Sequence, residues 1–409
     1  MRQLLVFTLS VLLFLSCGNH QKQVADKSEK GEKTELQYAR NITIERTKDY
    51  VIVRLLNPWK AGTVLHTYYL VERGKDINVP DDGTKVVIPL RKSVIFTTAH
   101  ANLVEMLHAQ KAIAGVADLK YMIIPDIQKR ARIKGGIVDC GDAMKPDIER
   151  IIDLNADAIL LSPFENNGGY GRLEQIGVPI IECADYMERS ALGRAEWMKF
   201  YGILFGREHE ADSLFAVVKQ NYKSLSQKAS QSKVTRSVLP DRKVGAVWYL
   251  PGGESSVGLL YKDAHGRYAY SNDKHSGSLA MPFETILDKF AQSDFWILSY
   301  NGNFNRRALL AEYQGYAKLK PYQTKEIYGC KVDSKPYFEE VSWRPDWLLH
   351  PRAVRTVKVN GRSIQERMAL AVMSFIFIYF MTVVIFSFLM MAAGLDFLSA
   401  FTAVIACIT

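Results

Sequence analysis

Two stretches of this chain carry nearly the same pattern, one in each half. The first is Pro146-Asp-Ile-Glu149-Arg-Ile151-Ile152-Asp153, followed by Asp157 and an apolar run. The second is Pro282-Phe-Glu284-Thr-Ile286-Leu287-Asp288, followed by Asp294 and another apolar run. Each glutamate opens a short helix, where a carboxylate suits the helix dipole, and each run is typical of a buried parallel strand. The alternative is two ordinary helix–strand units with a capping acid. The repetition favours one exposed carboxylate per half, an arrangement that suits a two-fold partner.

The N-terminus has the layout of a secretory signal. Arg2 precedes an apolar run that is too short to span a membrane, and the string Leu15-Ser16-Cys17-Gly18 follows it. This string resembles a bacterial lipobox, which implies cleavage before Cys17 and lipidation of that residue; a chance cysteine is the alternative. Residues 18–38 are mostly polar and predict a disordered tether. The folded part is therefore expected to be lipid-anchored on the periplasmic side of a bacterial membrane.

The body of the chain is long enough for two domains. Strand and helix patterns alternate along it, which predicts an α/β fold. We expect a first lobe over 39–188, a linking helical segment over 189–231 and a second lobe over 232–348. In the linking segment, apolar residues from Ala211 to Leu225 recur at helical spacing. Hairpin strands are expected over 41–56 and 63–71, and a single strand over 243–249.

Charge and motifs exclude several classes of function. The net charge of +9 is moderate and no basic run resembles a nucleic-acid surface, so no nucleic-acid partner is predicted. The chain has no nucleophile elbow, P-loop or HExxH string, so it is not expected to be an enzyme. The histidines share no ligand spacing, and no metal site is predicted. Three cysteines of the body, Cys140, Cys183 and Cys330, indicate no disulfide pairing.

Four strings in the body carry a family resemblance: Ala114-Gly-Val-Ala-Asp118, Leu192-Gly-Arg194-Ala195-Glu196-Trp197, Trp248-Tyr-Leu-Pro-Gly-Gly253 and Trp343-Arg-Pro345. Residues 40–348 resemble ABC-transporter substrate-binding lipoproteins of the ferric-siderophore/cobalamin type. The resemblance implies two Rossmann-like lobes joined by one long helix, as in class III periplasmic binding proteins. It implies a chelate ligand (a ferric siderophore or cobalamin) between the lobes, and no cofactor. It also implies that Glu149 and Glu284 dock onto arginines of a dimeric ABC permease, which works with its ATPase.

Ligand contacts are expected on loops at the carboxyl ends of strands. The candidates are Trp248 and Tyr249 before a Pro-Gly-Gly turn, Tyr170 in a glycine-rich loop, and Tyr186 after a strand. Each could pack on a chelate, or could serve local packing alone. Arg194 could pair with an anionic ligand. A structural pair between Arg194 and Glu196 is the alternative, which we favour slightly.

Residues 349–409 form a different kind of segment. Met368 to Leu395 contains no charged residue and is long enough to cross a bilayer, and the sequence from His350 to Ala406 resembles the last repeat of a Trk-type potassium-uptake membrane subunit. The resemblance implies a transmembrane helix and a short pore-like helix without an ion filter. The basic cluster before the apolar run conflicts with the topology that the signal sets. We expect a fused fragment that does not pack on the lobes; the alternative is a truncated potassium-uptake subunit.

Overall fold

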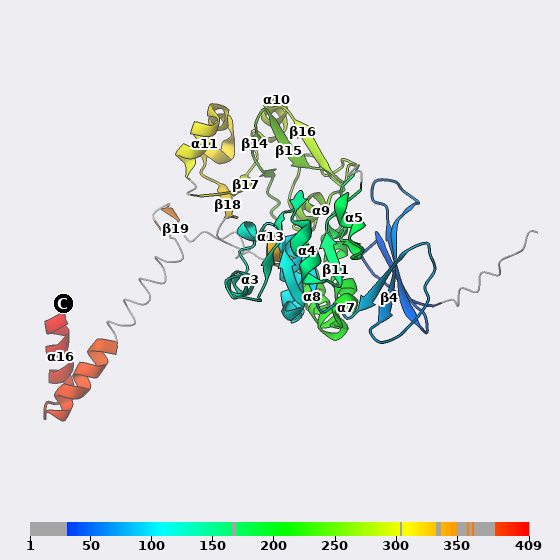
Figure 1. The fold of residues 1–409 in the computed structure, drawn as a ribbon. Coiled ribbons are helices and arrows are strands. Elements are labelled where there is room, and N and C mark those ends of the chain that lie inside the picture. The colour runs from blue at the N-terminus through cyan, green and yellow to red at the C-terminus, as the bar shows by residue number, and fades with distance from the viewer. Residues whose placement is uncertain are drawn as a thin grey trace, which may run out of the picture.

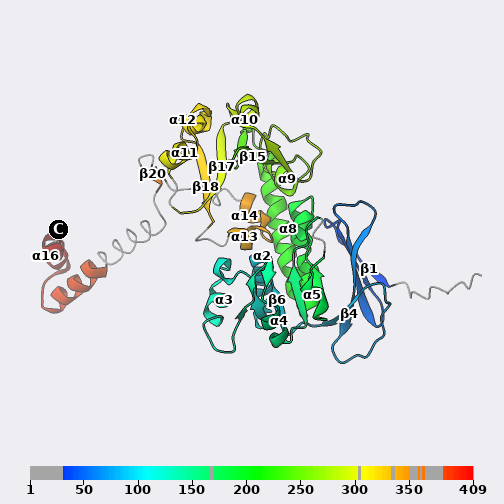
Figure 2. The same cartoon turned by 45° about the horizontal axis from the view of Figure 1, so that its top comes forward.

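The computed structural model describes residues 31–165, 169–302, 305–332, 337–349, 358–359, 362–363 and 381–408. Two α/β lobes lie along a long helix, α8 (Glu208–Ser230), and a separate sheet flanks the first lobe (Figures 1 and 2). The predicted α/β class with two lobes and a long helix is confirmed. The signal segment and Cys17 lie outside the described residues.

The flanking sheet has five strands in sequence order, antiparallel from β1 to β4, with β5 parallel to β4. Alternate side chains such as Ile44, Val53 and Leu70 are buried in the core of the first lobe, as the two-residue period of a strand requires. The strands span Glu32–Thr34 (β1), Ile42–Arg46 (β2), Tyr50–Leu56 (β3), Val64–Glu72 (β4) and Thr84–Ile88 (β5). The predicted hairpin strands are confirmed.

Residues 37–41 form a strap that two buried carboxylates hold in place. Glu196 accepts the amide N–H groups of residues 37–39 at 2.7–3.0 Å, and Glu188 accepts those of residues 40 and 41. Gly193 permits this close approach, because a Cβ there would lie 2.9 Å from the Tyr38 carbonyl oxygen. The prediction of a disordered tether up to residue 38 is therefore wrong for residues 32–38, because β1 pairs with β2 and residues 37 and 38 bind the distant Glu196. Residues 18–30 lie outside the described residues.

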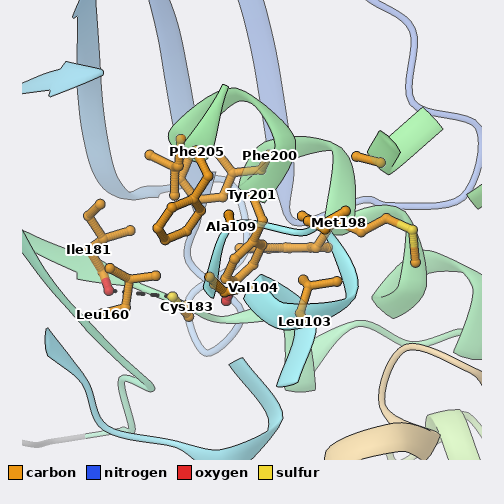
Figure 3. Packing of buried hydrophobic residues seen from close by; sticks show 14 of the residues in the cluster. Leu103, Val104, Ala109, Leu160, Ile181, Cys183, Met198, Phe200, Tyr201 and Phe205 are labelled. Carbon is orange, nitrogen blue, oxygen red and sulfur yellow. Dashed lines mark hydrogen bonds between the residues drawn. The ribbon is translucent and has the colours of Figure 1, made fainter. Parts of the chain in front are cut away.

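The first lobe is built on a parallel sheet with the strand order β12-β11-β6-β7-β8. Successive side chains of β11 enter different cores. Leu160 lies in the core that also contains Leu103 of α2 and Tyr201 of α7 (Figure 3). Ile159 lies in the core that Ile151 of α4 also enters. The strands are Ser93–Ile95 (β6), Ile113–Val116 (β7), Val138–Asp139 (β8), Ala158–Leu161 (β11) and Ile180–Glu182 (β12), with the small pair Gly141–Asp142 (β9) and Lys145–Pro146 (β10). The helices are Thr98–Met106 (α2), Pro125–Arg130 (α3), Ile148–Leu154 (α4) and Arg172–Gln175 (α5).

Three successive helices form the linking segment: α6 (Ala191–Glu196), α7 (Met198–Phe205) and α8. Gly206, at a φ of 64°, ends α7 in the left-handed conformation that favours glycine. Helix α8 buries Ala211, Phe215, Val218 and Tyr222, which lie three or four residues apart. The predicted helical segment and its apolar face are confirmed.

The second lobe combines a parallel sheet, β13-β17-β18, with an antiparallel sheet, β14-β15-β16. Its core centres on Trp248, Trp296 and Tyr316, whose ring centroids lie 5.0–5.8 Å apart. The strand predicted over 243–249 is instead a hairpin, because Gly245, at a φ of 60°, reverses the chain. The strands are Val238–Pro240 (β13), Lys243–Val244 (β14), Val247–Pro251 (β15), Ser278–Met281 (β16), Phe295–Tyr300 (β17) and Ile327–Lys331 (β18). The helices are Ser256–Asp263 (α9), Phe283–Phe290 (α10), Arg306–Glu312 (α11) and Lys320–Gln323 (α12).

The chain then returns to the first lobe as α13 (Tyr337–Val341) and α14 (Pro345–Leu349). Trp343 is fully buried in the core of that lobe, and its indole N–H donates to the Ala99 carbonyl oxygen at 2.7 Å. The predicted extent of the second lobe, 232–348, is therefore wrong for residues 337–348. The single-helix connection is also corrected, because the chain crosses between the lobes twice. Helix α13 packs on α2, and α14 packs on α8; both partners lie more than a hundred residues earlier in the sequence.

The described part of the tail lies away from the lobes in both views (Figures 1 and 2). Residues 381–392 are helical, Gly394 has a φ of 100°, and Asp396 accepts the amide N–H of Ser399 ahead of α16 (Phe397–Ile408). Gly394 and Asp396 thus separate the two helices of the tail. Among the described residues, no helix combines the length and apolar character needed to cross a membrane. The predicted membrane helix lies partly outside those residues, as do most residues around the pair β19 (Lys358–Val359) and β20 (Arg362–Ser363).

Replacing Glu196 by alanine should lower the free energy of unfolding by about 3 kcal/mol, because three amide groups of the strap lose a charged acceptor. Urea denaturation measures this change. The matched control is Glu208→Ala, which removes an exposed acid paired with Arg46 and should cost no more than about 1 kcal/mol. Equal effects of the two substitutions would contradict the role of the strap.

Shortening the chain at two positions tests the return of α13 and α14. A chain that ends at Leu349 should keep the melting temperature of the lobes, because the described part of the tail lies away from them. A chain that ends at residue 336 loses buried Trp343 and should be less stable by roughly 3–5 kcal/mol. Thermal unfolding followed by near-ultraviolet circular dichroism distinguishes the two. Equal stability of both shortened chains would contradict this account.

Candidate functional site

The repeated units occupy equivalent places in the two lobes, as α4–β11 and α10–β17. Ile151 and Ile286 are fully buried in the two cores. Two residues before each isoleucine, Glu149 and Glu284 lie in the first helical turn and are exposed. Each unit therefore holds its helix on the lobe by the isoleucine and presents the glutamate to solvent.

The aspartate after each helix has a structural role. Asp157 accepts the amide N–H groups of Arg91 and Lys92, just before β6, and Asp294 accepts that of Ser237, just before β13. In each lobe the aspartate thus fixes the start of the strand that pairs with its own. Burial alone would raise the pKa of Asp157, but these hydrogen bonds and the nearby Arg73 hold it below its ordinary value. The Ser237 amide, followed by the Lys320 ammonium, holds the pKa of Asp294 well below its ordinary value.

The lobes meet beside the carboxyl ends of two strands. Arg189, beyond β12 of the first lobe, pairs with Glu254, just beyond β15 of the second, at 3.6 Å, and Lys274 joins the same carboxylate at 3.1 Å. Behind this pair, the Tyr222 hydroxyl of α8 donates to Asp263 of α9 at 2.6 Å. On the side of the first lobe, the junction therefore lies beyond the carboxyl end of a parallel strand, where α/β sheets usually bind ligands.

Two of the predicted ligand residues have structural roles. Trp248 is fully buried, and its indole N–H donates to the Pro240 carbonyl oxygen at 2.9 Å. The prediction that it contacts a ligand is wrong, because alternation along β15 turns it into the core. Tyr170 donates to Glu182 at 2.7 Å, and His66 of β4 contacts the other oxygen of that carboxylate at 3.2 Å. Tyr170 therefore ties its loop to β12 and the flanking sheet, a contact that local sequence did not indicate.

The other two aromatic candidates remain accessible. Tyr249, next to Trp248 on β15, is 47% exposed. Tyr186 is half-buried beyond β12, and its hydroxyl donates to the Pro163 carbonyl oxygen beyond β11 at 2.5 Å. Tyr186 thus lies at the carboxyl edge of the first sheet, as expected. The structure does not bring these two side chains together with Trp248.

Arg194 forms a buried network, but not with Glu196. Its Nε–H donates to Asp185 at 3.0 Å, and His100 Nε2 lies 2.8 Å from the other oxygen of that carboxylate. Burial opposes ionisation of Asp185, yet His100 and Arg194 hold its pKa below the ordinary value. The preferred pairing of Arg194 with Glu196 is wrong, because Glu196 binds the strap.

Three exposed residues at the carboxyl edge of the first sheet were not among the candidates predicted from the sequence. Tyr121 follows β7, Met144 follows β8 in the β9–β10 turn, and Phe164 follows β11; they are 66%, 77% and 48% exposed. Large apolar residues shortly after predicted strands were the signal that could have found them. Within the residues that the structure describes, no cluster of three or more His, Cys, Asp or Glu side chains could hold a metal ion.

Comparison with known proteins agrees with this architecture. Residues 94–333 match the periplasmic binding protein family, and the chain belongs to it. An uncharacterized lipoprotein of Methanocaldococcus jannaschii is 23% identical over 370 residues, 81% of this chain and 86% of the relative. The structure of a possible iron-binding (periplasmic solute-binding) protein from Staphylococcus epidermidis is similar with a TM-score of 0.52 and 17% identity, over 65% of this chain and 98% of that one. This last similarity establishes the fold alone.

A separate similarity concerns a short stretch. Over 71 residues, the chain is 37% identical to the Trk system potassium uptake protein TrkG of Escherichia coli, which is 17% of this chain and 15% of the relative. The match covers too little of either protein to assign this chain to that family.

Acid should destabilise the second lobe through Asp294. Its folded-state pKa lies below the ordinary value of 3.8, so its stabilising effect is present above that value and is lost as the pH falls below it. Asp294→Asn should lower stability at pH 7 by about 1–3 kcal/mol and should flatten the loss of stability below about pH 4. Chemical denaturation from pH 7 to pH 2.5 measures both effects. The exposed control Asp49→Asn should reproduce the wild-type curve; an unchanged Asp294→Asn curve would refute the strand-fixing role.

Proposed function

We propose that this protein is the substrate-binding component of an ABC importer and delivers a chelate to its permease. The observation that supports this most strongly is the pair of exposed glutamates, Glu149 and Glu284, at equivalent places in the two lobes. A dimeric permease presents the same surface twice, so two similar acidic surfaces suit it. Exposed charges of this kind steer and orient an encounter more than they add affinity.

The proposed cargo is a ferric siderophore, cobalamin or a similar chelate. Tyr121, Met144 and Phe164 offer apolar surface at the carboxyl edge of the first sheet, where the organic framework of a chelate can pack. Tyr186 and Tyr249 are further candidates. The fold similarity to a possible iron-binding protein fits such a cargo.

The proposed location is the outer side of a bacterial cytoplasmic membrane, with a lipid on Cys17. The signal-like N-terminus supports this, and a relative that matches most of the chain is named a lipoprotein. Because the strap fixes residues 37–41 on the first lobe, such an anchor would reach the folded body through the residues before it.

Potassium uptake is a second candidate function, favoured by the short similarity to TrkG. Expression of the full chain in an Escherichia coli strain that lacks potassium uptake separates the two candidates. Our proposal expects no growth at low potassium. Rescue of growth would favour the second function.

Titration calorimetry against ferric catecholates, ferric hydroxamates, haem and cobalamin tests the proposed cargo. At least one chelate should bind with a micromolar or lower dissociation constant, and the double variant Tyr121→Ala/Phe164→Ala should weaken that binding by about tenfold or more. Val64→Ala changes a similarly exposed residue of the flanking sheet and should have no effect. Binding of none of these chelates would contradict the proposed function.

Removing the paired glutamates should separate binding from uptake. The variant Glu149→Ala/Glu284→Ala should bind its chelate with an unchanged dissociation constant, because neither glutamate is among the candidate ligand residues. Uptake of the radiolabelled chelate by cells should fall by about tenfold or more. Weaker chelate binding would instead place the glutamates in the ligand site.

A further inference from the structure

Positive charge gathers at the amino edge of the first sheet. Strands β6, β7 and β8 lie side by side and parallel, so the segments that lead into them meet at one edge. Ser93 donates to the Ala112 carbonyl oxygen at 2.8 Å, and Arg130 of α3 joins the next two segments. Its guanidinium donates to the carbonyl oxygens of Gln110 and Ile113 at 2.7 and 2.8 Å. Six exposed cations of these segments form what we call the basic edge: Arg91, Lys92, Lys111, Lys129, Arg132 and Lys134.

The surroundings of the basic edge leave most of its charge in place. Among the described residues, none of its six side chains forms an ion pair. The nearby acids Asp126 and Asp157 each pair with an arginine outside the set. Asp153, before β11, and half-buried Glu105 of α2 are too few to offset six cations. Burial also raises the pKa of Glu105 to about 7, which lowers its charge near neutral pH.

Helix dipoles account for only part of this cluster. Helices α2 and α3 end near this edge, and cations are stabilised at helix C-termini. Lys129 lies in the last turn of α3 and fits that role. Arg91, Lys92 and Lys134 lie outside the helices, in the segments that lead into β6 and β8. The helix ends therefore do not explain them, and their charges are available to an anionic partner.

The turn after α3 presents an apolar side chain between two of these cations. Ile133, between Arg132 and Lys134, is 56% exposed. Its amide donates to the Arg130 carbonyl oxygen at 3.1 Å, and the Gly136 amide donates to the Ile133 carbonyl oxygen at 2.9 Å. Two consecutive turns thus hold Ile133 in place. A single exposed apolar residue is common, but apolar side chains flanked by cations are typical of protein surfaces that enter the interface of a bilayer.

We propose that the basic edge, with Ile133 beside it, binds a bilayer that contains anionic phospholipid. The negative surface of such a bilayer attracts lysine and arginine, and its acyl boundary buries an apolar side chain, which a soluble polyanion does not. Ligands of α/β sheets bind at the carboxyl edge, so the opposite edge is free for a second partner. The inference does not depend on the proposed cargo or permease, and its tests need neither.

Flotation of the full chain with lipid vesicles measures this binding. Phosphatidylcholine vesicles are compared with vesicles of phosphatidylcholine and phosphatidylglycerol in equal parts. Phosphatidylglycerol should raise the partition coefficient, and Arg132→Glu/Lys134→Glu should lower it about tenfold or more on the mixed vesicles. Unchanged melting temperatures, expected for exposed side chains, exclude misfolding.

A matched control separates the basic edge from net charge. Lys228→Glu/Lys262→Glu changes two exposed lysines of α8 and α9 by the same total charge and should lower the partition coefficient far less. Any binding by the tail is common to all of these variants. Equal losses in the two double variants would overturn the inference, because net charge alone would then explain the binding.

A probe in the turn tests whether the apolar side chain enters the bilayer. A fluorescent amino acid is placed in the full chain at position 133, and at exposed Val217 of α8 as a control. Mixed vesicles with brominated acyl chains should quench the fluorescence at position 133 and leave that at position 217 unchanged. Binding without quenching at position 133 would mean contact through charge alone, as with any polyanion, and would overturn the proposed bilayer contact.

Discussion

The fold depends on one interaction that occurs in both lobes. In each, backbone amide groups just before one strand donate hydrogen bonds to an aspartate carboxylate just before the neighbouring strand. Asp157 fixes the start of β6, and Asp294 fixes the start of β13. Each hydrogen bond fixes the start of one strand relative to the strand that pairs with it, and so aligns the carboxyl ends of the two strands. The helices that carry Glu149 and Glu284, α4 and α10, lead directly into these two aspartates.

Sequence reasoning predicted the features that depend on local pattern. The pattern around Glu149 and Glu284 and the spacing along α8 each involve residues within a few turns of one another, and the structure contains both. The Arg194–Glu196 string was recognised, but the partners of its two charged side chains were not predicted. Arg194 donates to Asp185, and Glu196 accepts amide N–H groups of the strap; both partners come from other elements.

Two of the failures share one physical cause, which is that the partner lies far away in the chain. Residues 37 and 38 looked like a tether because their acceptor is about 160 positions later. Trp343 looked like part of the second lobe because its acceptor, Ala99, belongs to the first. Trp248 looked like a ligand residue because only pairing with the neighbouring strands decides which side of β15 faces the core.

The central claim is that a ligand binds between the two lobes, at the carboxyl ends of their strands. Hydrogen–deuterium exchange of the full chain, with and without a chelate that titrates, tests this most directly. The account predicts slower exchange in both lobes at once, in the loops around Phe164 and Tyr186 and around Glu254, with no change in the flanking sheet. Protection confined to one lobe, or to the opposite ends of the strands, would contradict it.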